Sequence, residues 1–417
     1  MNGSNFHIHQ SCPQCGGTVV LEETDRILQC PFCRVRLFVD QRPHFSHVLA
    51  PHPDHARKDL LFVPYWRFRG LVFALDGNRV AHRVLDTNAR AVEGLAGMPS
   101  SLGLRPQALS LRFAGPEIPG RFLAPSLSRK DFLKRLGNGL RGRLSNLSGR
   151  LFFQAFIGEA LSLIYSPVFR EDEALVDAIT GRNLSAEKIP QAGTQPSSGT
   201  APPDPPAFRP TLCPHCGDDL EGERDTLVLF CPNCHSSWEM GPSGFHPVDT
   251  SFAPLHSQGT AWLPFWALDI RCQGLPLETA DDLARLANIS RNMSPEAASR
   301  PFRFLIPAFK VSPKHLLLLA RFATLAQPHF PPRGRPPRAP LYPVTLPAVE
   351  AFQFTPILLG AVAAGKEDIF PKIRDTRFAF RDKSLIYFPF RRLGSEWIQD
   401  DLGCAIPANA LRWGRRL

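Results

Sequence analysis

Two cysteine quartets with the same spacing constrain this chain more than any other feature of its sequence. In each quartet, two residues separate the cysteines of a pair and fourteen residues separate the two pairs. Two such pairs on tight turns place four thiolates around one metal ion, and four thiolates are a favoured ligand set for Zn²⁺. The spacing therefore predicts two structural zinc ions. The predicted ligands are Cys12, Cys15, Cys30 and Cys33 in the first site, and Cys213, Cys216, Cys231 and Cys234 in the second.

Each cysteine pair has the composition of a metal-binding turn. Proline follows the first cysteine of all four pairs, and Gly16 and Gly217 stand where such turns often need positive φ. Between the pairs, "TVVLEE" and "TLVLFC" have the pattern of hairpin strands. Residues 10–40 and 211–240 thus resemble the zinc-ribbon superfamily, with its CPxCG…CPxC pattern. The resemblance implies small metal-clamped hairpins and no particular activity, because zinc ribbons occur in transcription factors, ribosomal proteins, helicases and assembly factors.

Other chemistries use similar cysteines. A rubredoxin-like iron site has the same four ligands and stays open as the alternative metal. Redox chemistry of the thioredoxin type needs a single pair that opens a helix, and catalytic zinc needs an open coordination position, which four thiolates do not leave. His215 and His235 lie beside the ligands, where we expect them to be neighbours of the site and not substitutes for a cysteine. Cys272 and Cys404 stand alone and are expected to be small buried apolar residues.

Further landmarks recur after each quartet in the same order. The stretch 61–70 (LFVPYWRFRG) matches 261–270, 121–127 (RFLAPSL) matches 303–309, and 161–172 matches 383–394. This order predicts a tandem duplication, and the fold class is α+β, in which each half has a zinc ribbon and a β-rich module with few short helices. The P-[YF]-W strand after a ribbon resembles uncharacterised bacterial zinc-ribbon proteins. We expect Trp66 to pack in a core, and Pro64 to mark an edge strand or a bulge.

Composition shifts divide the chain further. Residues 183–210 are rich in Pro, Ser, Gly and Thr, so we expect a disordered linker there. The predicted domains are ribbon 1 (1–42), β-rich module 1 (43–182), the linker (183–210), ribbon 2 (211–242) and β-rich module 2 (243–417). A Pro-rich insertion near 327–347 is expected to be an extended excursion. Helices are expected at 128–147, 294–300, 312–326 and 355–365, and a strand pair at 151–169.

Charge suggests where an anionic partner would bind. The formal net charge is +10, and two four-cysteine zinc sites would lower it to about +6, since each carries about −2. Both ribbons are acidic, and ribbon 2 is the more acidic of the two. Their negative charge disfavours contact with the phosphates of nucleic acid. The positive residues concentrate in 121–150 and 300–349. The simplest interpretation of these stretches is a solvated face, and the alternatives are contact with nucleic acid, with an acidic protein or, for 128–147, with a membrane surface.

No catalytic motif accompanies the cysteines. We find no P-loop, GxGxxG after a strand, GxSxG or HExxH, and His44, His47, His52 and His55 give only a weak second metal candidate. Residues 1–11 lack a secretory signal and no apolar run is long enough for a membrane span, so we expect a cytoplasmic protein without a transmembrane segment. The sequence favours a non-enzymatic scaffold that acts through a protein partner. The alternative is a nucleic-acid-binding accessory protein that uses 121–150 and 300–340, and an enzyme with a site between the modules is a third.

Overall fold

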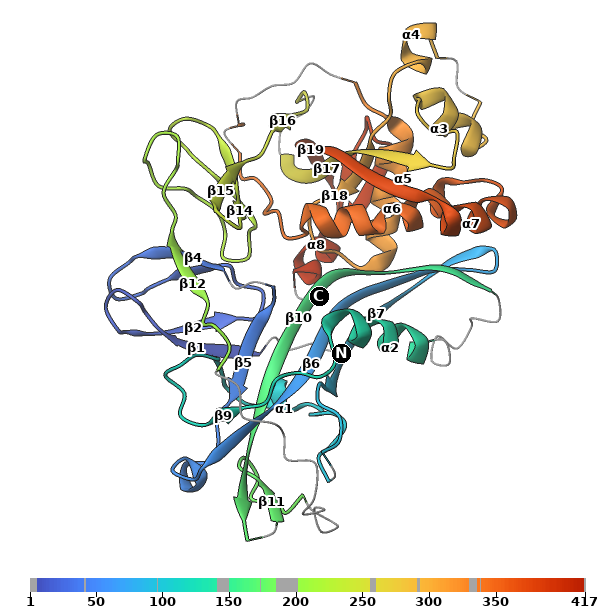
Figure 1. Cartoon of the computed structure of the whole chain (residues 1–417). Coiled ribbons are helices and arrows are strands. Elements are labelled where there is room, and N and C mark those ends of the chain that lie inside the picture. Colours follow the sequence, from blue (N-terminus) through green and yellow to red (C-terminus); the bar gives the residue numbers. More distant parts are fainter. Residues whose placement is uncertain are drawn as a thin grey trace. The chain divides into compact units, whose positions relative to one another are not determined.

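The computed structural model has a mixed fold in which strands predominate. It describes residues 6–40, 43–95, 97–140, 150–172, 174–184, 202–255, 260–290, 293–329, 336–337 and 339–415. These residues form eight α-helices, one short 3₁₀ helix and twenty-one strands (Figure 1). The expected β-rich mixture of strands and helices is confirmed. None of the described helices is long and apolar enough to cross a membrane.

The chain divides into two compact units that do not follow the expected domain boundaries. Unit 1 contains Met1–Arg69, Asp86–Leu140 and Ala160–Pro210, and unit 2 contains Gly70–Leu85, Arg141–Glu159 and Thr211–Leu417. Parts of the expected first module thus belong to unit 2. The reason is hydrophobic: Leu71, Phe73 and Ile157 are buried in the same core as the residues after 211.

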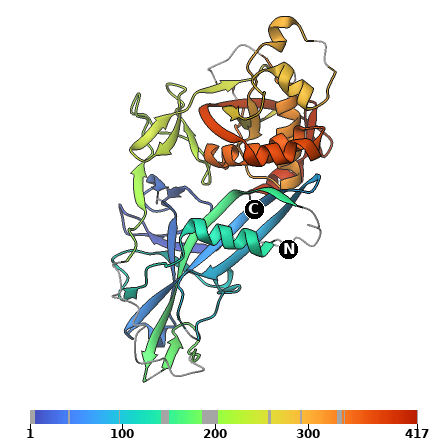
Figure 2. The ribbon, with the colours of Figure 1, turned by 45° about the vertical axis from the view of Figure 1, so that its right-hand side comes forward.

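Unit 1 holds ribbon 1 and most of a nine-stranded sheet. The strand order is β2-β1-β8-β5-β10-β6-β7, with β11 beside β10 and β9 beside β6. A short helix, α1 (Arg105–Ala108), and a longer one, α2 (Arg129–Leu140), accompany the sheet, and the ribbon in Figure 2 shows α2. Phe132 of α2 stacks on Trp66 with ring centroids 6.2 Å apart. The strands are β1 (His7–Ser11), β2 (Thr18–Glu22), β5 (Phe45–Leu49), β6 (Leu60–Asp76), β7 (Arg79–Arg90), β8 (Leu111–Phe113), β9 (Arg121–Phe122), β10 (Leu151–Glu171) and β11 (Ala174–Asp177).

Ribbon 1 is completed by a strand from the expected linker. β3 (Ile27–Gln29) pairs with β4 (Arg36–Asp40), and β4 pairs on its other side with β12 (Ala207–Pro210). The linker prediction for 183–210 is therefore wrong at its C-terminal end, while residues 185–201 lie outside the described residues. The four residues of β12 satisfy the free edge of β4, which explains why a segment with few apolar residues forms a strand.

Two long strands of the nine-stranded sheet, β6 and β10, differ from the sequence prediction. Residues 151–169 were expected to form a strand pair, but they lie in one strand, β10. Gly158 takes a φ of +67° inside this strand, so the glycine is accommodated and does not end it. Pro64 was expected at an edge or bulge, yet β6 lies between β10 and β7. Likewise, Pro264 lies in β17, which is flanked by β18 and β19.

Unit 2 joins ribbon 2 to a six-stranded sheet covered by helices. Ribbon 2 has the order β13-β14-β15, and the larger sheet has the order β18-β17-β19-β20-β21 with β16 beside β19. The strands are β13 (Val228–Phe230), β14 (Ser237–Gly241), β15 (Gly244–Pro247), β16 (Thr250–Phe252), β17 (Thr260–Gln273), β18 (Phe304–Pro307), β19 (Arg377–Leu393), β20 (Glu396–Gln399) and β21 (Cys404–Pro407). The helices are α3 (Ala280–Leu286), α4 (Pro295–Ala298), α5 (Pro313–Ala326), α6 (Ala348–Val362), α7 (Lys366–Asp375) and α8 (Ala408–Gly414).

The helix predictions are confirmed where a Ser-Pro pair marks the start of the helix. α5 and α4 begin at Pro313 and Pro295, directly after a serine, as expected. α2 confirms the helix predicted at 128–147 as far as Leu140. Residues 141–147 lie outside the described part of the chain. α6 is longer than the predicted 355–365 helix and starts earlier. α7 was missed because Pro371 lies inside it.

The Pro-rich insertion near 327–347 ends inside the core of unit 2. Leu341 forms a parallel bridge with Trp262, and Val344 and Leu346 are buried. The prediction of an extended excursion is therefore wrong for residues 341–346, which lie against the protein's own sheet.

Trp66 and Trp266 are both buried, which confirms the core interpretation of the P-x-W strands.

Candidate metal centres

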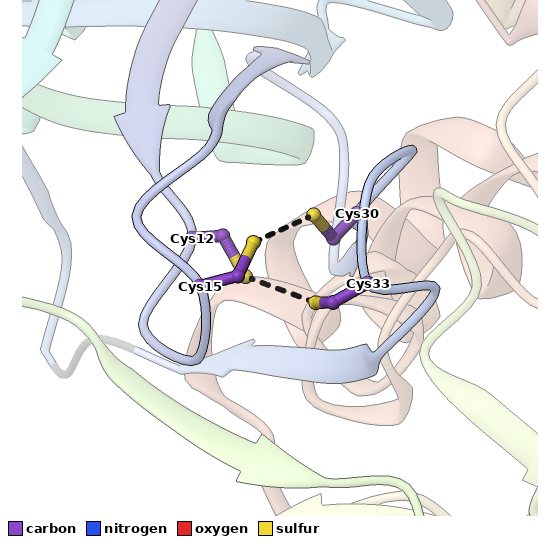
Figure 3. A group of neighbouring side chains, drawn as sticks. All are labelled: Cys12, Cys15, Cys30 and Cys33. Carbon is purple, nitrogen blue, oxygen red and sulfur yellow. Dashed lines mark hydrogen bonds between the residues drawn. The ribbon is translucent and has the colours of Figure 1, made fainter.

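The first cysteine quartet comes together at two turns that face each other. Figure 3 shows Cys12 and Cys15 on one turn and Cys30 and Cys33 on the other. The Sγ atoms of Cys12 and Cys33 are 3.7 Å apart, and those of Cys15 and Cys30 are 3.6 Å apart. All four sulfurs lie within 4.8 Å of one another. The predicted ligands of the first site therefore converge on one point.

The second quartet repeats this geometry. The Sγ atoms of Cys213 and Cys234 are 3.6 Å apart and those of Cys216 and Cys231 are 3.4 Å apart, and all four again lie within 4.8 Å of one another. A tetrahedral site with metal–sulfur bonds of about 2.3 Å has sulfur–sulfur edges of about 3.8 Å. The observed distances are close to this value, so each group of four cysteines could hold one metal ion. Among the residues that the structure describes, only these two groups of His, Cys, Asp and Glu converge in this way.

The same two backbone hydrogen bonds form all four turns. In each, the N–H four residues after the first cysteine donates to that cysteine's carbonyl oxygen at 2.9–3.0 Å. The first cysteine's own N–H donates to the carbonyl five residues later, at 2.8–3.0 Å. The donor at the fourth position has positive φ every time: Gly16 (74°), Arg34 (64°), Gly217 (79°) and His235 (60°). Gly16 and Gly217 confirm the prediction, whereas the same conformation at Arg34 and His235 was not foreseen.

Side chains beside Cys234 in the second cage favour its thiolate form. Ser236 Oγ lies 2.9 Å from Cys234 Sγ, and Trp238 Nε1 donates to Ser236 Oγ at 2.7 Å. The hydrogen bonds that Cys234 receives from Ser236 and His215 lower its pKa to about 5. The same hydrogen bond and the thiolate charge raise the pKa of His215. His215 thus lies beside the cage as expected, and it adjoins a ligand that is ionised near neutral pH.

An acidic residue between the cysteine pairs fastens ribbon 1 to its module. Glu23 is buried between β2 and β3 and forms an ion pair with the buried Arg67 of β6. Arg69 Nη1 lies 3.7 Å from the other Glu23 oxygen, and Arg67 also reaches Asp86 at 3.1 Å. Burial alone would lower the pKa of Arg67, but Glu23 and Asp86 raise it above its ordinary value. Removal of one partner would leave charge buried without compensation.

Ribbon 2 uses acids of the corresponding segment in the same way. Asp225 Oδ2 accepts from Arg415 Nε at 2.9 Å, and Glu223 pairs with the same arginine. Glu239 of β14 forms an ion pair with Lys383 of β19. Part of the negative charge that distinguishes this ribbon is therefore neutralised within unit 2.

The histidine candidates do not form a metal site. His44 and His47 point into the interior of unit 1, where burial lowers the pKa of His44 to about 4 and of His47 to about 3. His52 and His55 lie at the 3₁₀ helix Pro53–His55, and His55 Nδ1 is 3.0 Å from the carbonyl oxygen of Ala178. None of the four belongs to a convergent ligand group among the described residues.

The two unpaired cysteines and the basic stretches can also be placed. Cys272 and Cys404 are buried as expected, and burial raises the pKa of each to about 12. In the first basic stretch, Arg121 pairs with Asp59 at 3.0 Å and Arg135 with Glu93 at 2.6 Å. In the second, Lys314 and Arg321 line a cavity beside α5, a feature that sequence reasoning missed.

No protein-family model, curated protein or solved structure matches this chain.

Loss of one thiolate should remove one ion. We expect about two metal ions per chain in the purified protein and about one in Cys216→Ser, because three thiolates bind structural zinc far more weakly than four. Metal content measured by mass spectrometry on the desalted protein checks this. Cys272→Ala removes a buried thiol outside the cages and should leave the content unchanged. A metal-free wild-type protein would contradict the assignment.

The conformation at Gly16 gives a test of the turn. A Cβ at Gly16 would meet no atom within 4 Å, but φ is +74°. Gly16→Ala should therefore lower the free energy of unfolding by about 1–2 kcal/mol through backbone strain alone. Gly139→Ala in α2 also meets open space, and it should leave stability equal or up to about 1 kcal/mol higher. Urea denaturation of the metal-loaded proteins compares the two, and equal effects would argue against the strained turn.

The buried ion pair should matter more than an exposed one. Glu23→Gln leaves the charge of Arg67 under-compensated in the interior of unit 1 and should destabilise the protein by about 3 kcal/mol. Glu171→Gln removes the exposed pair with Lys58, which spans 3.2 Å, and should cost at most about 1 kcal/mol. Chemical denaturation measures both variants. Losses of the same size would mean that the Glu23–Arg67 pair does not fasten the ribbon.

Proposed function

We propose that each group of four cysteines binds a structural zinc ion. Four thiolates complete a tetrahedral shell and leave no position for substrate or water, which favours a structural role over a catalytic one. Reducing conditions keep such thiols available, so the proposal includes a cytoplasmic location. Iron in a rubredoxin-like site is the alternative, and metal analysis of the purified protein separates the two.

We further propose that the two halves arose by duplication of one ribbon-plus-module unit. Three hydrogen bonds or pairings recur. Trp66 Nε1 donates to the Leu127 carbonyl at 2.7 Å, and Trp266 Nε1 donates to the Leu346 carbonyl at 2.8 Å. The Leu123 N–H donates to Phe62, and the Tyr342 N–H donates to Trp262, at 3.0 and 2.9 Å. In both halves, the residue that receives the indole comes four positions after the residue that donates this N–H.

The third correspondence is in the sheets. β10 pairs in parallel with β5 and then forms a hairpin with β11. β19 pairs in parallel with β16 and then forms a hairpin with β20. The recurrence supports the match of 161–172 with 383–394. The proposed duplication also changes the partner of 121–127. Its counterpart by hydrogen bonding is 340–346, in place of 303–309.

In this proposal the protein is a non-enzymatic scaffold that binds another protein in a larger assembly. The observation that carries it is Phe32, on the second turn of ribbon 1, whose side chain is 68% exposed. The ring lies against the backbone of Gly17, where an added Cβ would come within 2.4 Å of it. A large aromatic side chain held in water by a metal-clamped turn has the features of an interface anchor. Its counterpart in ribbon 2 is the polar Asn233.

The electrostatics favour ribbon 1 over ribbon 2 as the contact surface. Glu223, Asp225 and Glu239 of ribbon 2 pair with cations of unit 2, so only part of its acidic surface is free for a basic partner. The second candidate function is the nucleic-acid-binding accessory protein. It is favoured by Lys314 and Arg321, which line a cavity without acids, but not by the paired Arg121 and Arg135.

Phe32→Ala should remove the partner and spare the metal. With the tagged chain as bait in its native cells, we expect a stoichiometric protein partner with the wild type and its loss, by about tenfold or more, with Phe32→Ala. Metal content should stay at about two ions per chain. Quantitative mass spectrometry of the eluates, together with metal analysis of the same samples, makes both measurements.

A matched control distinguishes a specific contact at Phe32 from nonspecific binding by exposed apolar side chains. Leu104 is 77% exposed in unit 1 and lies outside the ribbons, so Leu104→Ala should retain the partner. Equal loss in both variants, or a partner that survives Phe32→Ala, would contradict the proposal. Abundant bound nucleic acid, with filter-binding affinity that falls steeply with salt, would favour the second candidate instead.

A further inference from the structure

A cavity of about 320 Å³ lies in unit 2, outside the cysteine cages. Its walls come from the start of β7, one face of α5, the end of α6 and the start of α7. The volume is within the range of small-molecule sites. The function proposed for the ribbons does not involve this cavity.

The polar lining of this cavity is entirely basic. Five side chains contribute, and no Asp or Glu is among the lining residues. Within the described part of the chain none of the five forms an ion pair, although the acids Glu367 and Asp368 follow directly in α7. A group of like charges without counter-charges raises the local concentration of anions. The five residues are Arg79, His82, Lys314, Arg321 and Lys366.

Backbone and ring groups add to this field. Lys314 is in the first turn of α5, and Lys366 is the first residue of α7, so the positive ends of two helices lie at the same cavity. The His82 ring packs edge-on against Phe73, with ring centroids 6.0 Å apart. Burial, followed by the charge of Lys314, lowers the pKa of His82. The lowered pKa favours the neutral imidazole, which can accept or donate a hydrogen bond beside the four cations.

The remaining lining is apolar. Leu317 and Leu318 of α5 contribute to the wall, and Phe322 lies on the next turn with its side chain 40% exposed. An inorganic anion alone would leave this surface in water. A ligand that carries both a highly charged group and a flat or apolar group would use both parts of the cavity.

We propose that this cavity binds the oligophosphate group of a small phosphate ester, of the nucleoside triphosphate class, with the nucleoside against Phe322. Four cations match the three to four negative charges of a triphosphate better than the one or two of a carboxylate ligand. Recognition is by side-chain charge, and no P-loop sequence is present. The site binds the nucleotide, and the proposal includes no bond cleavage.

Calorimetry on the full zinc-loaded chain tests this site. The probes are adenosine triphosphate and inorganic triphosphate at low salt, without Mg²⁺. Lys314→Gln and Lys366→Gln should each weaken both probes by about tenfold, because each removes one charge from the phosphate site. Phe322→Ala should weaken adenosine triphosphate and leave inorganic triphosphate unchanged, since only the nucleoside contacts the ring. Thermal unfolding confirms that each variant is folded.

Lys372 gives the matched control. It is exposed on α7, six residues from Lys366, and does not line the cavity, so Lys372→Gln makes the same change in net charge elsewhere. Unchanged binding by Lys372→Gln supports the site. Absence of binding by either probe, or equal weakening by Lys372→Gln, overturns it. Displacement of adenosine triphosphate by a single-stranded oligonucleotide at a lower phosphate concentration would overturn the small-ligand assignment and point to nucleic acid as the source of the phosphates.

Discussion

The attachment of each ribbon to its module depends on acids that the cysteine cage holds in position. Closure of four sulfurs brings two turns together, so the segment between the cysteine pairs has little freedom. In ribbon 1 this segment carries Glu23, which meets Arg67 in the interior of unit 1. In ribbon 2 it carries Asp225, which meets Arg415. A buried ion pair tolerates little displacement, because a charge without its partner costs several kcal/mol. The cage therefore orders more than its own hairpin.

This arrangement changes the meaning of the acidic ribbons. In sequence, their charge suggests a surface for a basic partner. In the structure, Glu23 is buried and Asp225 is nearly so, and each is paired inside its own unit. What the first ribbon leaves in water is instead an aromatic ring, Phe32, on the turn next to the sulfurs. The ribbon is thus joined to its module on one side by charge and presents an apolar group on another.

Sequence reasoning succeeded where the relevant residues are close in the chain. All eight cysteines could be located, because each pair is one turn and only fourteen residues separate the two pairs. α5 could be located from its Ser312–Pro313 start. It failed where a distant segment decides: β12 joins β4 from about 170 residues away, and the basic cavity collects β7, α5 and α7. Local composition indicated a linker at the first place, and at the second it grouped Lys314 and Arg321 in one basic stretch without Arg79, His82 or Lys366.

The two halves differ most between their P-x-W strand and the carbonyl that receives the tryptophan. In the first half, this interval contains β7, which pairs with β6, followed by α1, β8 and β9. In the second half, it contains α3, α4, β18 and α5. In the proposed phosphate cavity, α5 of the second interval supplies Lys314, Arg321 and Phe322, and Arg79 and His82 come from the first interval. If both halves derive from one unit, the cages and the tryptophan contacts are its retained frame. The divergent interval is then where a new binding site could arise without disturbing the ion pairs that hold the ribbons.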